Sequence, residues 1–167
     1  RPTTSRSTRA HRPPPRAPVV TTTGASATVR TAHAYDDELA AFDGVATAEA
    51  VRSGALSAAE VVGAAIERAR AVEPDVHALV IDDFDRARAT AGEGRGGPFA
   101  GVPTVIKDMT DVAGLSTRNG SAAFSRVGPA TETGSLAAQL FDMGMIGLGK
   151  STLPEFGFIP CAEFPDA

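Results

Sequence analysis

Lysine occurs only twice in this sequence, and one of the two stands where it could act as a base. Lys107 follows an apolar run from Val102 to Ile106, so we expect its amine at the end of a buried strand. Ligand sites of α/β sheets gather at such strand ends. Burial there would disfavour the charged ammonium and favour a neutral amine that accepts a proton near neutral pH. The alternative, which periodicity alone favours, is a lysine that emerges into solvent and pairs with Asp108.

The second lysine, Lys150, lies in the stretch GMIGLGKS, which matches the nucleotide-binding pattern G-x-x-x-x-G-K-[ST]. In a P-loop a strand leads into the glycines and a helix begins at the Lys-Ser pair, so that N–H groups point at phosphate. Here a helical pattern precedes Gly144, and Pro154 follows too closely for a helix start. We therefore expect a helix-to-strand junction, with Lys150 in a structural role that binds carbonyl groups at the sheet edge. The alternative is a nucleotide-binding protein, which an assay of ATP or GTP binding would distinguish from the other interpretations.

Two helices are predicted before the first strand. The stretch FDGVATAEAVRSG predicts a short helix with Asp43 near its cap and Gly54 past its end. The next helix opens with a capping box, in which the side chains of Ser57 and Glu60 each satisfy a free N–H group, and Pro74 follows its end. Apolar residues recur at helical spacing along this second helix: Val61, Val62, Ala65, Ile66 and Ala69.

The rest of the chain alternates strands and helices. HALVIDD, VPTVIKD and MIGLG predict strands, DFDRARATA predicts a small helix, and GEGRGG and residues 111–132 predict loops. TGSLAAQLFDMG predicts a helix that ends near Gly144. Its apolar face would comprise Leu136, Ala137, Leu140, Phe141 and Met143.

Composition separates a basic N-terminal tail from an acidic body. Residues 1–35 contain six arginines and no acidic residue, whereas residues 36–167 carry ten basic and twenty acidic residues, a net charge of −10. The Pro-, Thr- and Arg-rich composition of the tail predicts disorder rather than a nucleic-acid-binding arm. No apolar run is long enough to span a membrane and no secretory signal is visible, so we expect a cytoplasmic protein without a membrane partner. The single cysteine, Cys161, and the scattered histidines His11, His33 and His77 predict no metal site.

Three segments resemble, in order and spacing, the N-terminal part of an amidase signature enzyme. They are VRSGALSAAEVVGAAIERARAVEPDVHALV, GPFAGVPTVIKDMTDVAGLSTRNGS and PATETGSLAAQLFDMGMIGLGKSTLPEFG. The resemblance covers the chain from about Asp43 onward. It implies an α/β fold with a mixed sheet between helices, and a hydrolase of linear amides with a triad of a nucleophilic Ser, a second Ser in a cis peptide and a Lys. Lys107 matches that lysine, so the resemblance implies that it is the general base.

The resemblance also implies what this chain does not carry. The family's Gly- and Ser-rich motif, which supplies both triad serines, would follow PEFGF, and the chain stops at Ala167 without it. Four serines before that point lie in no such motif: Ser121, Ser125, Ser135 and Ser151. We therefore expect residues 36–167 to be the truncated N-terminal part of an amidase domain, inactive by itself. Arg at position 1 suggests a fragment, a processed product or a reading frame opened upstream of the true start.

The expected reaction is cleavage of a C–N bond in a small carboxamide, with no metal or organic cofactor and no nucleic acid partner. In the family the region of Phe156, Gly157 and Phe158 approaches the acyl pocket, so these residues are predicted to contact the substrate. The family's habit suggests a homodimer of the full-length protein. Two alternatives stay open: the amidase subunit of a tRNA-dependent amidotransferase, and a catalytically dead truncated product with an exposed sheet edge.

Overall fold

The computed structural model describes Leu39 and residues 42–160. The predicted tail over residues 1–35 lies outside the described residues, as do His11, His33 and Cys161. The described chain forms these elements in order: helix α1 (Gly44–Ser53), helix α2 (Ala58–Val76), strand β1 (Leu79–Asp82), helix α3 (Phe84–Glu93), strand β2 (Pro103–Lys107), 3-10 turn η2 (Ala122–Phe124), helix α4 (Ser135–Asp142), strand β3 (Ile146–Ser151) and 3-10 turn η3 (Glu155–Gly157).

The first two helices begin and end with the capping residues that the sequence predicts. The Asp43 side chain accepts a hydrogen bond of 2.8 Å from the N–H of Ala46, and Gly54 ends α1 in the left-handed conformation. At the start of α2, the Ser57 N–H donates to Glu60 Oε2 at 2.8 Å and the Glu60 N–H donates to Ser57 Oγ at 3.2 Å. Both groups of the capping box are therefore satisfied.

The predicted end of α2 before Pro74 is wrong, because the helix continues to Val76 with the proline inside it. The helix ends at His77, whose backbone is left-handed (φ 48°) and whose N–H donates to the Glu73 carbonyl at 2.9 Å. The Glu73 side chain also accepts a hydrogen bond of 3.0 Å from the N–H of Leu79. Proline removes only one backbone donor in this last turn, and these two bonds to Glu73 close the helix beyond it.

The capping box predicts a pH dependence of helix α2. Hydrogen bonds from the Ser57 backbone and then from its hydroxyl lower the pKa of Glu60 below its usual value of 4.5. A lowered folded pKa contributes stability that is present above the usual pKa and lost as pH falls through the folded one. In a synthetic peptide of residues 55–78, helicity measured by circular dichroism should fall more between about pH 7 and about pH 2 than in the same peptide with Glu60→Gln. Equal losses in both peptides would show that Glu60 is not the titrating group.

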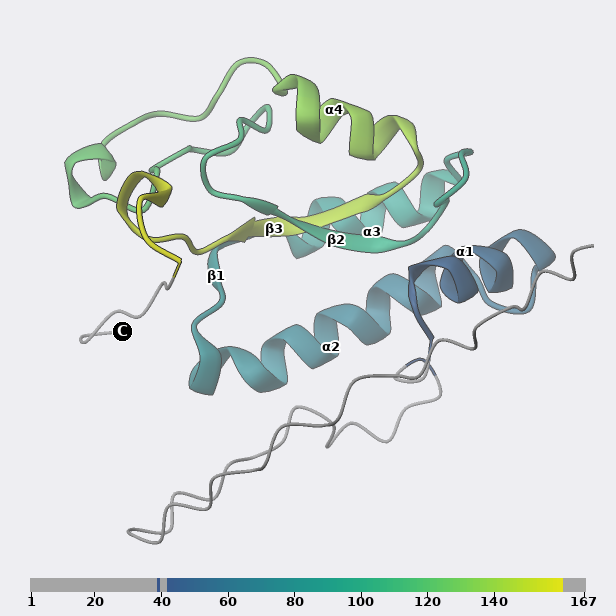
Figure 1. Ribbon diagram of the computed structural model, residues 1–167. Helices are drawn as coiled ribbons and strands as arrows, with labels where there is room; N and C mark the ends of the chain where they lie inside the picture. The colour runs from purple at the N-terminus through teal and green to yellow at the C-terminus, as the bar shows by residue number, and fades with distance from the viewer. Residues whose placement is uncertain (1–38, 40–41, 161–167) are drawn as a thin grey trace, which may run out of the picture. The chain divides into compact units, whose positions relative to one another are not determined.

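The three strands form one mixed sheet with β3 in the centre. The strand order is β1-β3-β2; β1 runs antiparallel to β3, and β2 runs parallel to it. The parallel pair aligns Lys107 with Ser151, so the two strands end at the same edge of the sheet. Figure 1 shows the yellow turn η3 at this end, directly after β3. The mixed α/β sheet is the one that the resemblance implies.

Helices cover the two faces of the sheet (Figure 1). On one face, residues of α2 and α3 pack against Ile146 and Leu148 of β3. On the other, Ala137 of α4 packs with Ile106 of β2 and with Val112 of the loop after it. The prediction for α4 is correct in part: Leu140 and Phe141 pack against this second cluster, whereas Leu136 is 59% exposed.

The junction between α4 and β3 excludes a P-loop. The helix ends at Met143, Gly144 follows with a left-handed φ of 92°, and β3 then runs through Lys150 and Ser151. The order is thus helix, turn and strand, and the Lys-Ser pair lies in a strand rather than at a helix start. The predicted helix-to-strand junction is confirmed. No helix within the described part of the chain is long and apolar enough to cross a bilayer.

Candidate active site at the end of the mixed sheet

Lys107 is the last residue of β2, as predicted, but its side chain is exposed rather than buried. Among the described residues its amine makes no hydrogen bond or ion pair. The alternative is correct in that the side chain emerges into solvent, but not in the pairing with Asp108, because Asp108 pairs with Lys150. The burial prediction is wrong for the described residues because β2 is an edge strand of their three-stranded sheet, and a second neighbour would be needed to cover its end.

The carboxylate of Asp108 pairs with Lys150, and both side chains are fully buried. Lys150 Nζ lies 3.0 Å from Asp108 Oδ1, donates to Thr117 Oγ1 at 2.9 Å and donates to the Ser116 carbonyl at 3.2 Å. Two of these oxygens, those of Thr117 and Ser116, accept hydrogen bonds from the amine. The contact with Asp108 Oδ1 is an ion pair without hydrogen-bond geometry, so this buried oxygen has a charged neighbour but no hydrogen-bond donor among the described residues. The predicted structural role of Lys150 in binding a carbonyl is observed, although its strand is central and not at an edge.

Asp108 is also fixed through its backbone. Its N–H donates to the Ser151 carbonyl at 3.1 Å, and its carbonyl accepts from the N–H of Asn119 at 3.0 Å. The second side-chain oxygen, Oδ2, accepts from the N–H of Arg118 at 3.2 Å. The residue after the predicted base is therefore held by β3 on one side and by the loop of residues 116–121 on the other.

Phe156, Gly157 and Phe158, the residues predicted to contact substrate, lie in and after η3 at the same end of the sheet. The N–H of Phe156 donates to the Asn119 carbonyl at 2.8 Å, which joins η3 to the loop of residues 116–121. The Phe156 ring meets that of Phe124 edge to face, with centroids 5.8 Å apart. Phe158 is 84% exposed, so these rings are not core residues of the described chain. Their contact with substrate stays a prediction.

Gly120 lets this loop approach the backbone before η3. Its φ is 66°, and a Cβ at this position would lie 2.4 Å from the Leu153 carbonyl oxygen and 2.8 Å from that of Pro154. A neighbouring side chain adds to the contact, since the Ser121 hydroxyl donates to Glu155 Oε1 at 2.6 Å. Ser121 is therefore engaged in a structural bond. A larger residue at position 120 would separate the loop from η3.

We expect Gly120→Ala to destabilise the intact protein by about 3 kcal/mol, because a left-handed backbone and a steric overlap both oppose the methyl group. Gly94→Ala is the matched control: its φ is 67°, but a Cβ there meets nothing within 4 Å. That variant should lose only about 1 kcal/mol, the backbone cost alone. Urea unfolding of the two variants measures the difference, and equal losses would contradict the close approach at Gly120.

A cavity of about 370 Å³ lies beside the ion pair. Its walls include Asp108, Arg118, Gly120 and Leu153, so it adjoins the loop of residues 116–121. The Nε of Arg118 is buried and has no hydrogen-bond partner among the described residues. Sequence reasoning missed the roles of Asp108, Thr117 and Arg118. Lys150 itself was the signal that could have found them. A lysine within the apolar strand IGLGKS is buried, and a buried ammonium requires oxygen atoms as partners.

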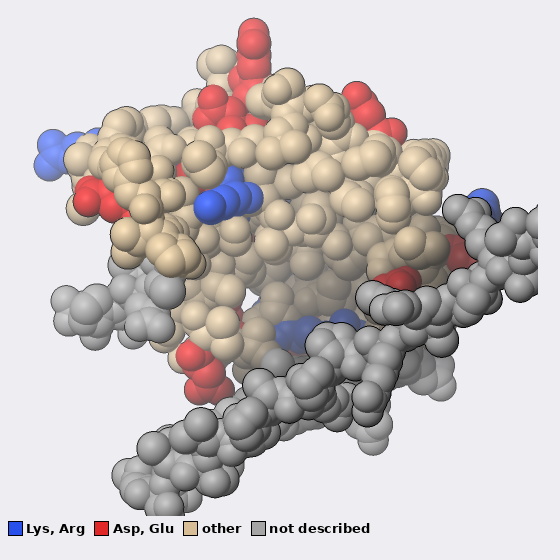
Figure 2. Space-filling model, viewed as in Figure 1, with Lys and Arg blue, Asp and Glu red and all other residues tan. Residues whose placement is uncertain are grey.

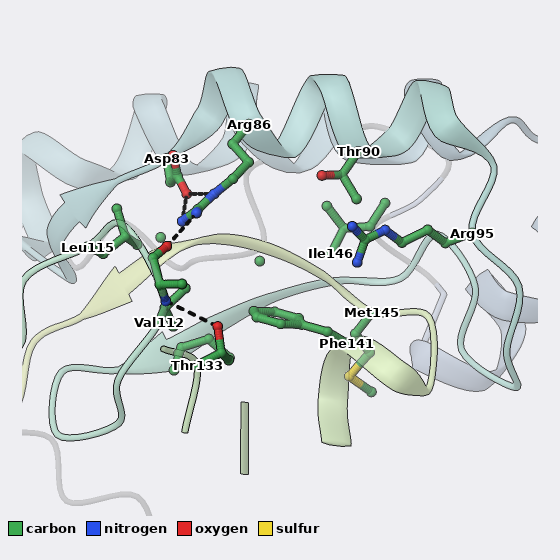
Figure 3. Close-up of a pocket in the computed structure, with 14 residues that line it drawn as sticks. Asp83, Arg86, Thr90, Arg95, Val112, Leu115, Thr133, Phe141, Met145 and Ile146 are labelled. Carbon is green, nitrogen blue, oxygen red and sulfur yellow. Dashed lines mark hydrogen bonds and ion pairs between the residues drawn. The ribbon is translucent and has the colours of Figure 1, made fainter. Parts of the chain in front are cut away.

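A second cavity, of about 240 Å³, lies between α3, α4 and the sheet (Figure 3). It contains neither Lys107 nor Phe156, Gly157 or Phe158. Figure 3 shows Arg86 reaching from α3 to Asp83, with which it forms an ion pair. The Arg86 guanidinium also donates to the Ala113 carbonyl at 2.7 Å. These bonds tie the loop after β2 to α3. The cavity therefore lies apart from the predicted site.

Part of the exposed surface near the site is apolar. Uncharged residues make up most of the face of the described chain that is drawn in Figure 2. Exposed apolar side chains at this end of the sheet include Val105, Met109 and Phe158. The described residues contain no group of three or more His, Cys, Asp or Glu that could share a metal ion.

The family model for amidases, named Amidase, matches residues 60–165, which is more than half of the chain and includes the strand that carries Lys107. The chain belongs to the amidase signature family. The resemblance found in the sequence is thereby confirmed, and so is the fold that it implied.

Individual amidase relatives agree with this assignment. The chain is 43% identical to the putative amidase AmiC of Mycobacterium tuberculosis over 80% of its own length and 28% of the relative's. It is 36% identical to the 6-aminohexanoate-cyclic-dimer hydrolase of Paenarthrobacter ureafaciens over 69% of its length and 24% of the relative's. The X-ray structure of the peptide amidase from Stenotrophomonas maltophilia superposes with a TM-score of 0.64, at 28% identity, over 71% of this chain and 26% of that one. The chain thus spans about a quarter of the length of the amidases it matches.

Proposed function

We propose that the intact protein is an amidase that hydrolyses the C–N bond of a small carboxamide, and that this chain supplies the Lys107 amine of a Ser–cisSer–Lys triad. The observation that carries the proposal is the family match across the motif that ends in Lys107 and Asp108. The names of the relatives, amidase and cyclic-dimer hydrolase, support amide substrates as a class.

In this proposal Lys107 acts on a serine and not on the substrate itself. The Lys107 amine accepts a proton relayed through the bridging serine, and the nucleophilic serine attacks the amide carbonyl. The C–N bond breaks as the leaving amine takes up a proton, and water then releases the acid from the acyl-enzyme. Both serines would come from residues outside this chain. The exposed amine at the end of β2 suits that role, because a serine from another segment could reach it.

The substrate would lie beside η3. Phe156 and Phe158 present apolar surface at the same end of the sheet as Lys107. The exposed Met109 lies next to Gly157, since a Cβ built at Gly157 would be 4.0 Å from the Met109 sulfur. Such a surface favours the apolar part of an amide over a charged group. The substrate-binding role of Phe156, Gly157 and Phe158 is part of this proposal.

Ammonia release from a panel of primary carboxamides tests the proposal. The intact protein should turn over at least one of them with a chelator present, whereas the 167-residue chain alone should release none, since it lacks both triad serines. Ammonia release by the 167-residue chain alone would overturn the proposed triad. No release by the intact protein from any aliphatic or aromatic carboxamide would overturn the substrate class.

A further inference from the structure

We propose that the buried ion pair between Asp108 and Lys150 is a positioning device for the Lys107 amine. In this view it fixes the backbone at the end of β2 and holds the loop of residues 116–121 against it. The inference rests on the proposed function, in which Lys107 is the base. Asp108, Lys150 and Thr117 are positioning residues that act through Lys107.

The Lys107 side chain depends on its backbone for position. Among the described residues, no hydrogen bond holds its amine. Its backbone pairs with Ser151 across the sheet, and its carbonyl accepts from the N–H groups of Met109 at 2.8 Å and Thr110 at 3.0 Å. The strand therefore turns sharply directly after Lys107. Any change in the conformation of that turn therefore moves the backbone atoms of Lys107 from which the side chain extends.

The ion pair holds this turn from the adjacent position on each strand. Asp108 follows Lys107, and Lys150 precedes Ser151, the residue that Lys107 pairs with. The 3.0 Å contact between the two side chains thus joins β2 and β3 directly beside the backbone pair of Lys107 and Ser151. A shift of either strand end would separate two buried charges, which is costly in an apolar interior.

A buried ion pair is a poor means of adding stability alone. Well-packed apolar side chains of similar size often stabilise a fold as much or more, because burying two charges carries a large desolvation cost. The pair instead fixes the relative position of the groups that it joins. Its oxygens and protons have fixed partners in Thr117 Oγ1, the Ser116 carbonyl and the Arg118 N–H, and apolar side chains would not specify such a geometry.

The same loop supports the predicted substrate residues. Asn119 donates its N–H to the Asp108 carbonyl and accepts the N–H of Phe156 at its own carbonyl. The backbone of Asp108, the residue after the predicted base, and η3 are therefore connected through a single residue. Backbone hydrogen bonds thus hold η3 to this loop, and they do not depend on the side chain of Thr117.

The test is Thr117→Val in the intact protein, assayed on the best carboxamide. The substitution removes one acceptor of Lys150 and keeps side-chain shape. We expect kcat to fall about tenfold with KM within about twofold, because the base is misplaced and the substrate surface is retained. Thr104→Val is the matched control: among the described residues its hydroxyl, on β2, makes a single weak hydrogen bond, to the Val105 carbonyl at 3.5 Å, and kcat should be unchanged. Unchanged kcat in Thr117→Val, or a rise in KM alone, overturns the inference.

A second pair of variants keeps the test decisive. The double variant Asp108→Leu/Lys150→Met removes both charges together, and its kcat should fall about 100-fold even when its melting temperature matches that of the parent. The single variant Lys150→Arg should lose less kcat than the double variant, since a guanidinium can still donate to the same oxygens. If Lys107→Ala is inactive while the double variant and Thr117→Val keep the parent kcat, the positioning inference alone fails. If Lys107→Ala keeps the parent kcat, the proposed function fails first.

Discussion

Lys107→Ala in the intact protein should lower kcat for amide hydrolysis by about 10³-fold, the usual scale for removing a general base. The melting temperature should stay close to that of the parent, because the Lys107 side chain is exposed and makes no contact that the described residues would lose. Steady-state ammonia release measures the loss of rate. A thermal melt shows that the variant is folded.

Lys107→Arg separates proton transfer from charge. A guanidinium keeps the positive charge but stays protonated, so it cannot accept a proton at neutral pH. The arginine variant should therefore be as inactive as the alanine variant. Substantial activity in Lys107→Arg would mean that position 107 contributes charge or packing, and it would remove Lys107 from the role of base.

Lys150→Met should lower the free energy of unfolding by about 3–5 kcal/mol, the range measured when one partner of a buried ion pair is removed. The reason is the location of the pair: both side chains are fully buried, so Asp108 would be left as an uncompensated buried carboxylate. Asp108→Leu should cost a similar amount, because it leaves the Lys150 ammonium without its counter-charge. Urea unfolding of the intact protein gives both values.

The double variant and an exposed pair serve as controls for this prediction. Asp108→Leu/Lys150→Met should lose much less than the sum of the single losses, because neither charge remains. Arg95→Met removes one partner of an exposed pair, in which Arg95 Nε lies 3.5 Å from Glu93 Oε2, and should change stability by less than about 1 kcal/mol. Additive losses in the double variant would show that the two buried side chains act independently.

Local signals in the sequence predicted most of the fold. The caps of α1 and the capping box of α2 act over three or four residues, so their residue types suffice to find them. The position of Gly144 between a helical pattern and an apolar strand likewise excluded a P-loop correctly. The error at Pro74 has a local cause too, since hydrogen bonds to Glu73 close α2 two residues beyond the proline.

The site was harder to predict because its geometry depends on distant contacts. The sequence places Asp108 next to Lys107, and only the fold brings Lys150 to it from another strand. The burial expected for Lys107 failed for a similar reason, since burial depends on which segment lies beside β2 and not on the apolar run before it. The exposure of Leu136 has a similar cause. Helical spacing identifies the residues that share one face of α4, but the segment packed against that face determines how many of them are buried.

The central place of β3 has a consequence for how the sheet assembles. Within the described residues β1 and β2 pair only with β3, the last of the three strands to leave the ribosome. The contacts between α2 and α3 are local and can form early, whereas every strand pairing must wait for residues 146–151 and then close a long loop. During synthesis β1 and β2 are two unpaired strand edges at the same time. The stretch IGLGKS is therefore the segment that must be present before either of the other two described strands can pair.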